Sequence, residues 1–149
     1  MQLVVFRIDG QRYALPLAAV ERIVRAVEVT PLPGAPAIVL GAIDVEGRVV
    51  PVLNIRRRFL LPEREVGLAD QFLIARSARR EMALVIDEAQ GVIELPESAV
   101  IDPAQIVPGL EQFQGLVRLD GGLILIHDLE KFLSLDEASA LDEARTRDG

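Results

Sequence analysis

The stretch GAIDVEGRVVPVLNIRRRF, residues Gly41 to Phe59, decides the fold class of this 149-residue chain. It reads as an apolar strand, a Glu46-Gly47 turn and a second, nearly continuous apolar strand. Glycine, and an acidic residue placed before it, tolerate the positive φ angles that a two-residue hairpin turn requires. The stretch therefore predicts a β-hairpin, and three arginines follow directly after it.

The same pattern recurs 74 positions later, in GLVRLDGGLILIHDLEKFL, with its turn at Asp120-Gly121. Near the start of the chain, QLVVFRI and RYALPL flank an Asp9-Gly10 turn, and a shift of 69 positions lays them over DQFLIAR and REMALVI. Two halves that share one plan indicate an internal duplication. About five short strands in each half would form two small barrels, an arrangement that limits exposed sheet edges.

Composition removes several classes of function. Half of the residues are hydrophobic, so the chain can build a core without metal or disulfide support, and it contains no cysteine. The net charge of −7 argues against nucleic-acid binding, which usually needs a basic face. No apolar run reaches the roughly 18 residues that span a bilayer. These features predict a soluble cytoplasmic protein.

No group of residues forms a convincing catalytic, cofactor or metal site. The one histidine, His127, precedes Asp128, and Asp87 precedes Glu88. Adjacent residues of a strand point to opposite faces, so neither pair is expected to converge on a substrate. Asp128 and Asn54 each follow a strand and precede a helical turn, which predicts that they cap helix N-termini. The sequence thus predicts a protein that is not an enzyme and that holds no cofactor.

Four local expectations follow from the hairpin and its surroundings. Pro51 lacks an N–H group, so we expect it at a strand edge or a bulge. Arg56, Arg57 and Arg58 are expected to stay hydrated at the rim of the barrel and to help orient a partner. The segment AAVERI is compatible with one or two helical turns. The continuous apolar run VVPVLNI is either covered on both faces or awaits a partner, which favours a protein-binding module.

At this point the chain resembles the CheW family, the scaffold proteins of bacterial chemosensory arrays. The resemblance covers residues 2 to about 133. It rests on four stretches, of which the second is the most specific: YALPLAAVERIV, LPGAPAIVLGAIDVEGRVVPVLNIRRRF, MALVIDEAQGVIEL and GLVRLDGGLILIHDLEKFL.

The resemblance implies a mainly all-β fold of two intertwined five-stranded SH3-like barrels with short helices, including a C-terminal helix. We accordingly expect one CheW-like domain over residues 1–133. Its two subdomains span about 2–60 and 71–133, and strand exchange between them stays open. Residues 134–149 are expected to form an acidic helical tail.

The resemblance also implies a function. Proteins of this family are adaptors that bind the regulatory domain of a CheA-type histidine kinase and the cytoplasmic tip of a chemoreceptor, and they insert into no membrane themselves. The protein would be cytoplasmic and would reach membrane-bound receptor arrays through these partners. Two alternatives stay open: a divergent CheW-like module that has lost receptor coupling, and a small nucleic-acid-binding barrel.

Carried over residue by residue, the receptor-facing positions fall on Val20, Arg22, Gly41 and Glu46. The family usually has Arg before the glycine of the hairpin turn, where this chain has Glu46, and often has Glu where Arg22 stands. We therefore predict that these two charges face each other as a pair of reversed polarity. Kinase contacts are expected in the second half, near 85–92 and 109–115, at Val85, Asp87, Val92 and Gly115.

Overall fold

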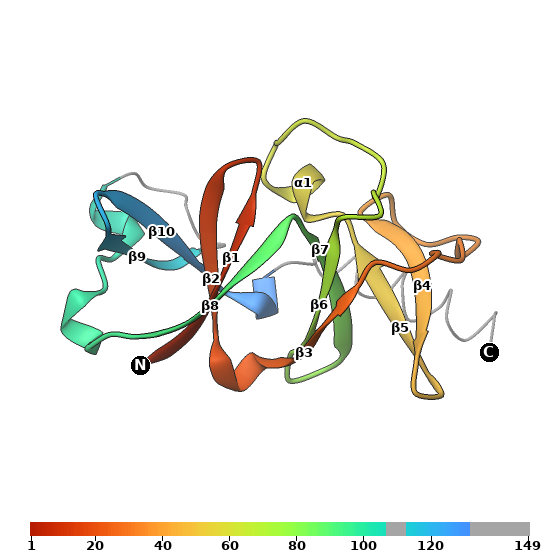
Figure 1. Cartoon of the computed structure of the whole chain (residues 1–149), viewed down its shortest axis with the longest axis horizontal. Helices are drawn as coiled ribbons and strands as arrows, with labels where there is room; N and C mark the ends of the chain where they lie inside the picture. The colour runs from red at the N-terminus through yellow and green to blue at the C-terminus, as the bar shows by residue number, and fades with distance from the viewer. Residues whose placement is uncertain (107–112, 132–149) are drawn as a thin grey trace.

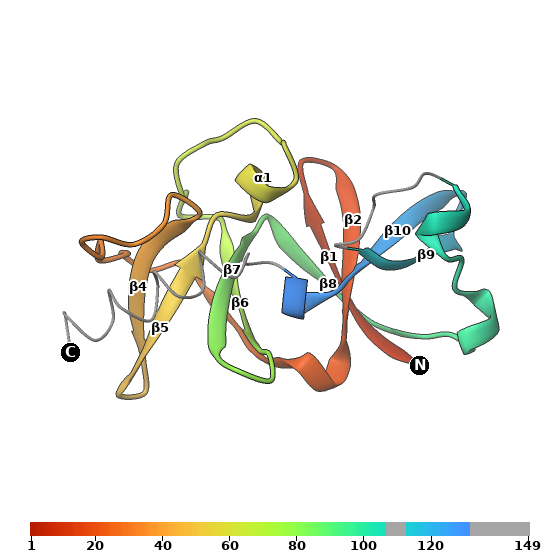
Figure 2. The same cartoon turned by 180° about the vertical axis from the view of Figure 1, so that it is seen from behind.

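The computed structural model describes residues 1–106 and 113–131. It contains ten strands and a few single-turn helices (Figures 1 and 2). The helical turns are η1 (Leu17–Ala19), α1 (Ile55–Arg58), η2 (Glu97–Ala99), η3 (Pro103–Gln105) and η4 (Leu129–Lys131). The strands are β1 (Gln2–Ile8), β2 (Gln11–Pro16), β3 (Val20–Arg25), β4 (Val39–Val45), β5 (Arg48–Leu53), β6 (Gln71–Arg76), β7 (Glu81–Ile86), β8 (Glu88–Glu94), β9 (Phe113–Leu119) and β10 (Gly122–His127).

The strands form two five-stranded sheets, which we name barrel A and barrel B. Barrel A has the order β8-β1-β2-β10-β9, and barrel B has the order β3-β6-β7-β5-β4. The two lie side by side along the long axis, with barrel A on the left of Figure 1. Each sheet draws strands from both halves of the sequence, so neither 2–60 nor 71–133 is a barrel by itself.

The two barrels have the same topology and the same register. Replacing β1, β2, β8, β9 and β10 by β6, β7, β3, β4 and β5 converts one strand order into the other. The pair Val4↔Leu15 in barrel A corresponds to Leu73↔Leu84 in barrel B, at the offset of 69. The parallel pair Ile126↔Ala14 corresponds to Val52↔Ala83, at the offset of 74 for the first residue and 69 for the second. The pairing therefore supports the internal duplication that the sequence indicates.

Three hydrophobic clusters hold the structure together. One lies inside barrel B around Val50 and Ile74, and one lies inside barrel A around Leu3 and Ile124. The largest contains residues of both barrels, among them Phe6, and joins the two sheets through a shared core. Burial of apolar area is the main favourable contribution to folding, so the barrels are expected to fold as one unit.

The hairpin turns match the predictions. Asp9, Glu46 and Asp120 have φ angles of 52°, 51° and 51°, and the glycine after each also has a positive φ. Positive φ at both central residues defines the type I′ turn that suits the twist of a β-hairpin. An acidic residue followed by glycine, between two apolar strands, therefore predicted these hairpin turns from the local sequence.

Two local expectations are wrong. AAVERI does not form helical turns throughout, because the 3₁₀ turn ends at Ala19 and β3 begins at Val20. Pro51 lies in β5, which has neighbours on both sides, and is paired with Ala42. It is tolerated there because the ladder from β5 to β7 begins only at Val52, so no donor is missing at residue 51. The acidic tail, 134–149, lies outside the described residues.

Candidate functional site

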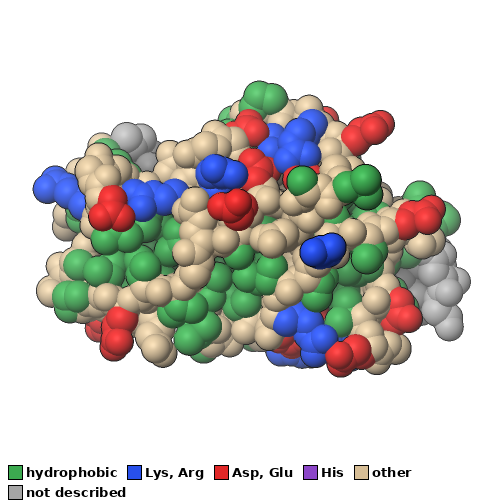
Figure 3. Space-filling model, in the orientation of Figure 1, with side chains coloured by type: hydrophobic (Ala, Val, Ile, Leu, Met, Phe, Trp, Pro, Cys, Tyr) green, Lys and Arg blue, Asp and Glu red, His purple; other side chains and the backbone are tan. Residues whose placement is uncertain are grey.

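The edge strands β3 and β8 occupy equivalent positions in the two barrels and carry different side chains. β8 is mostly exposed, and 54% of Val92 is accessible to solvent. β3 exposes charged residues, among them Glu21 and Arg22. On the face seen in Figure 3, hydrophobic side chains gather over the β8 side and charged ones beside β3. The exposed side chains of β8 itself are mixed, since Glu88, Gln90 and Glu94 accompany Val92.

Arg22 and Glu46 form the predicted pair. Arg22 Nη1 donates a hydrogen bond to Glu46 Oε1 at 2.7 Å, from β3 to the turn between β4 and β5. This hydrogen bond and the charge of Arg22 lower the pKa of Glu46 below its ordinary value. Both side chains remain exposed, so the pair is available to a partner. Val20 lies on the same strand and is half-buried.

Gly41 belongs to the interior of barrel B. It is buried, has a φ of +151°, and a Cβ at this position would overlap the carbonyl oxygen of Thr30. The structure therefore brings Arg22 and Glu46 together at the surface and places Gly41 beneath it, where close packing of two backbones requires glycine.

A second ion network lies near Arg22 and was not predicted. Arg48 donates to both carboxylate oxygens of Glu81, at 3.0 and 2.8 Å, and Arg76 Nε donates to Glu21 at 2.8 Å. The hydrogen bonds from Arg48 are the main cause that lowers the pKa of Glu81 to about 2. The only signal for this network in the sequence was the presence of opposite charges at strand ends. Which acidic side chain pairs with which arginine depends on how the strands pair.

The residues predicted for kinase contact lie on different elements. Val85 is half-buried in β7, and Gly115 is buried in β9, where a Cβ would overlap Val100. Asp87 lies at the junction of β7 and β8, and its carboxylate bonds to groups of the same chain. Of the four, Val92 alone is mostly exposed.

An apolar groove of about 660 Å³ lies at the end of barrel B. One wall is the segment that comes directly after β3 in the sequence, and the other is part of the connector between α1 and β6. Leu40 of β4 also lines the groove. Val27 is 55% exposed and Leu68 is 99% exposed. This groove was not among the predictions from the sequence, although Val66 and Leu68 were a signal for it. Its full lining is Ala26, Val27, Glu28, Val29, Leu40, Glu65, Val66, Gly67 and Leu68.

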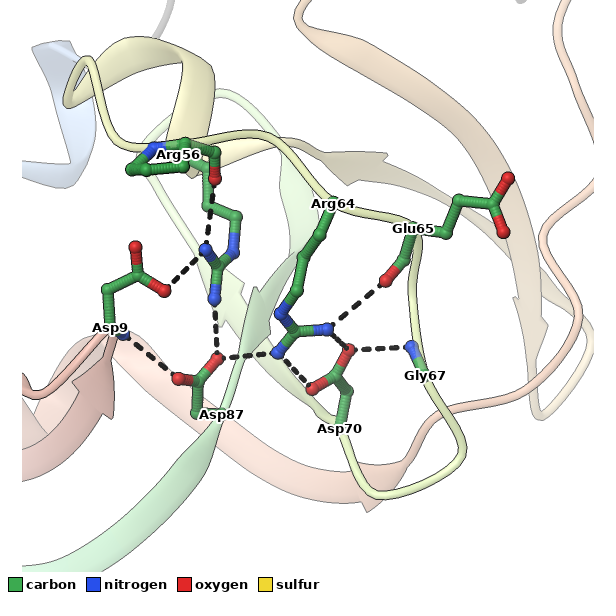
Figure 4. A network of polar contacts seen from close by, with 8 residues as sticks. Asp9, Arg56, Arg64, Glu65, Gly67, Asp70 and Asp87 are labelled. Carbon is green, nitrogen blue, oxygen red and sulfur yellow. Dashed lines mark hydrogen bonds and ion pairs between the residues drawn. The ribbon is translucent and has the colours of Figure 1, made fainter.

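The prediction for the three arginines is wrong for Arg56. Its side chain is only 7% exposed and bonds to Asp9 Oδ1 at 2.6 Å and to Asp87 Oδ1 at 2.9 Å (Figure 4). It also donates to the carbonyl oxygen of Pro62 at 3.0 Å. Arg57, by contrast, is 54% exposed and pairs with Glu63. Successive residues of the single turn α1 point in directions about 100° apart, so neighbouring arginines meet different surroundings.

The two capping predictions have different outcomes. Asp128 Oδ1 accepts a hydrogen bond from the backbone N–H of Glu130 at 3.1 Å, as expected for a cap. Asn54 occupies the N-cap position of α1 without a side-chain capping bond, and its amide instead donates to Glu63 at 3.4 Å.

His127 lies inside the shared core. It is completely buried, and its ring stacks on Phe59 at a centroid distance of 4.3 Å and on Tyr13 at 5.1 Å. Burial lowers the pKa of His127 to about 3, because removal from water disfavours the charged imidazolium. An enclosed, neutral imidazole among aromatic rings agrees with a role in packing.

Within residues 1–106 and 113–131, no three acidic, His or Cys side chains converge as metal ligands would. No helix in this part of the chain is long and apolar enough to cross a membrane.

Comparison with known proteins gives a consistent set of similarities. Residues 2–137 match the CheW-like domain family. The chain is 29% identical over 146 residues to the chemotaxis protein CheW of Treponema pallidum, covering 94% of this chain and 86% of that protein. It is 24% identical to CheW of Rhizobium meliloti, covering 93% and 91%.

A solved structure supports the fold. The scaffolding protein TtCheW from Thermoanaerobacter tengcongensis superposes with a TM-score of 0.81 at 23% identity, covering 91% of this chain and 89% of that one. Because the family match extends from residue 2 to residue 137, the chain belongs to the CheW-like domain family.

Proposed function

We propose that this protein is an adaptor that couples chemoreceptors to a CheA-type histidine kinase in a bacterial chemosensory array. The observation that carries the proposal is the family match over residues 2–137, since relatives of similar length are chemotaxis proteins. The protein acts by binding both partners and holding them together, without catalysing a reaction. It works in the cytoplasm and reaches the membrane-bound array through its partners.

The receptor tip binds the face that carries β3 and β8. The exposed Arg22–Glu46 pair offers adjacent positive and negative charges, and the half-buried Val20 lies on the same edge strand as Arg22. Exposed charges beside an apolar surface favour orientation and selectivity of a partner more than affinity. Gly41 contributes indirectly, because it allows β4 to pack closely against Thr30.

The kinase regulatory domain binds the exposed strand ends of barrel B, at the apolar groove. Val27 and Leu68 supply apolar surface that water covers in the free protein. Burying such surface at an interface is favourable at about 25 cal/mol per Å². None of the four residues that the resemblance suggested lines this groove. Asp87 is connected to it through Arg64 and Asp70, whereas Val85 is half-buried in β7 and Val92 and Gly115 belong to barrel A.

One experiment tests the adaptor role. The purified protein is mixed with the kinase regulatory domain, with a receptor cytoplasmic fragment, and with both, and complexes are separated by size. A complex of all three, together with kinase phosphorylation that depends on receptor only when this protein is present, is the expected result. Failure to bind either partner would contradict the proposal.

The exchanged charges at Arg22 and Glu46 favour one second candidate, a divergent module that binds the kinase but has lost receptor coupling. The same mixing experiment distinguishes it, because such a module forms the kinase complex and leaves the receptor fragment unbound.

A further inference from the structure

The connector between α1 and β6, residues 61–70, which we name the strap, contains a bidentate ion pair between Arg64 and Asp70. Arg64 Nη1 bonds to Asp70 Oδ2 at 2.8 Å, and Arg64 Nη2 bonds to Asp70 Oδ1 at 2.7 Å. Asp70 is only 4% exposed. Two parallel bonds between guanidinium and carboxylate fix both the distance and the orientation of the partners. The ion pair therefore fixes the shape of the strap next to Asp70, the residue that directly precedes β6 of barrel B.

Asp70 is bonded to both walls of the apolar groove. The backbone N–H of Gly67, in the strap wall, donates to Asp70 Oδ2 at 2.7 Å. The backbone N–H of Ala26, in the wall that follows β3, donates to the carbonyl oxygen of Asp70 at 3.1 Å. Because one residue bonds to both walls, the width of the groove depends on where Asp70 and its partner Arg64 are held.

Asp87 connects this arrangement to the other barrel (Figure 4). Its Oδ1 accepts from Arg64 Nη2 and from Arg56 Nη2, each at 2.9 Å. Its Oδ2 accepts from the backbone N–H of Asp9 at 2.9 Å. Asp9 belongs to the β1–β2 turn of barrel A, and its own carboxylate accepts from Arg56 at 2.6 Å. One carboxylate thus receives bonds from the strap, from α1 and from barrel A.

We propose that Asp87 couples the apolar groove of barrel B to the β1–β2 turn of barrel A, with Arg64 and Asp87 as positioning residues for the kinase regulatory domain. The identity of that partner rests on the proposed function, whereas the coupling between the two places does not. Charge-assisted bonds that share an acceptor depend on one another, since moving one donor changes the position available to the next. A change at the turn of barrel A therefore alters the groove wall.

Amide hydrogen exchange of the full chain, measured by NMR, tests the coupling without any partner. Arg64→Ala removes the bidentate bond, and we expect exchange of the Gly67 amide to rise by about tenfold through local opening. Asp9→Asn acts from barrel A, and we expect about a threefold rise at Gly67 and Ala26. Asn tolerates the positive φ of this position, so the turn itself is kept.

Arg48→Ala is the matched control, because it breaks an ion pair of barrel B outside this network. It should leave exchange at Gly67 and Ala26 unchanged. If Arg64→Ala prevents folding, Arg64→Lys keeps the charge and loses the bidentate geometry, and it should show the same direction of change. The proposal is overturned if Asp9→Asn changes exchange only within its own turn.

Binding of the kinase regulatory domain provides a second, separate measurement. Arg64→Ala and Asp9→Asn should weaken that binding by about fivefold. The reason is that a groove wall without a fixed position must become ordered on binding, which costs free energy. Arg48→Ala should not. If the unaltered protein does not bind the kinase domain, the proposed function fails while the exchange data still decide the coupling. If binding occurs and all variants bind equally, the positioning role is wrong.

Discussion

Arg22 on β3 and Glu46 in the β4–β5 turn meet at 2.7 Å across barrel B, where their sequence separation is 24 residues. The contact joins the edge strand β3 to the turn of the β4–β5 hairpin. It therefore lies at the charged sheet edge, where a partner can reach it. Exposed pairs of this kind add little to stability, because both groups are also well solvated when apart. Their significance lies in which partner they select.

Reversing this pair one charge at a time should harm receptor binding more than reversing both charges. Arg22→Glu places two carboxylates together, and Glu46→Arg places two guanidinium groups together, whereas the double variant restores an opposite-charge pair. Binding of the receptor fragment is measured for all three variants, with thermal unfolding recorded to confirm that folding is unchanged. Equal loss in the three variants would show that the two residues act independently.

Stability should fall with acid between pH 7 and pH 5 because of His127. Its pKa is about 3 when folded, below the value of roughly 6.5 when unfolded, so the unfolded chain binds more protons in this range. The stability present above pH 6.5 is therefore lost as the pH falls towards 3, and the loss is about 2 kcal/mol at pH 5. Urea unfolding at several pH values measures this loss.

The control for this prediction comes from the duplication. Leu53 stands at the position equivalent to His127, at the offset of 74, so His127→Leu is the substitution that the fold already accommodates. The chain has one histidine, so this variant should show a nearly flat stability between pH 7 and pH 5. A slope equal to that of the unaltered protein would assign the effect to carboxylates instead.

Local signals predicted the hairpins, but they did not predict which strands from the two halves of the chain pair with each other. Asp9-Gly10, Glu46-Gly47 and Asp120-Gly121 carry their own conformational preference, so each turn was readable from two residues. Nothing in β1 or β2 indicates that their other neighbours are β8 and β10, because Arg7 pairs with Glu88 and Arg12 with Ile124, 81 and 112 positions away. Intertwining was therefore open until the pairing was known.

For the candidate site, the exchanged charges at Arg22 and Glu46 predicted a contact, because the charge differs from the usual family residue at both positions and in opposite directions. Arg56 was missed for the opposite reason, since its two neighbours in sequence are also arginines and a run of like charges suggests a solvated surface. Its partner Asp87 was expected at a kinase contact from the family resemblance, and its bonds to Arg56 and Arg64 were not predicted. Burial at such junctions depends on the packing of both barrels and is not encoded locally.

Gly41 and Gly115 are equivalent positions that should respond differently to alanine. At Gly41 the new Cβ meets backbone of Thr30 and the φ is +151°, so relief requires moving a strand, and we expect a loss above about 2 kcal/mol. At Gly115 the obstacle is the side chain of Val100. Val100→Ala should therefore partly rescue Gly115→Ala, in unfolding measured by urea. Absence of rescue would mean that backbone crowding dominates at both positions.

Arg56 should be the arginine of α1 on which stability depends, with Arg57 as its matched control. Arg56→Ala removes a cation that is only 7% exposed from Asp9 and Asp87. Both carboxylates are partly exposed and Asp87 keeps its bond to Arg64, so we expect a loss of about 1–3 kcal/mol, below the cost of breaking a fully buried pair. Arg57→Ala removes an exposed pair with Glu63 and should stay within about 0.5 kcal/mol. Arg56→Lys should recover only part of the loss, because one ammonium group cannot reach Asp9, Asp87 and the Pro62 carbonyl with the geometry of a guanidinium. Similar free energies of unfolding for the two alanine variants would show that the hydrated-rim interpretation was right for Arg56 after all.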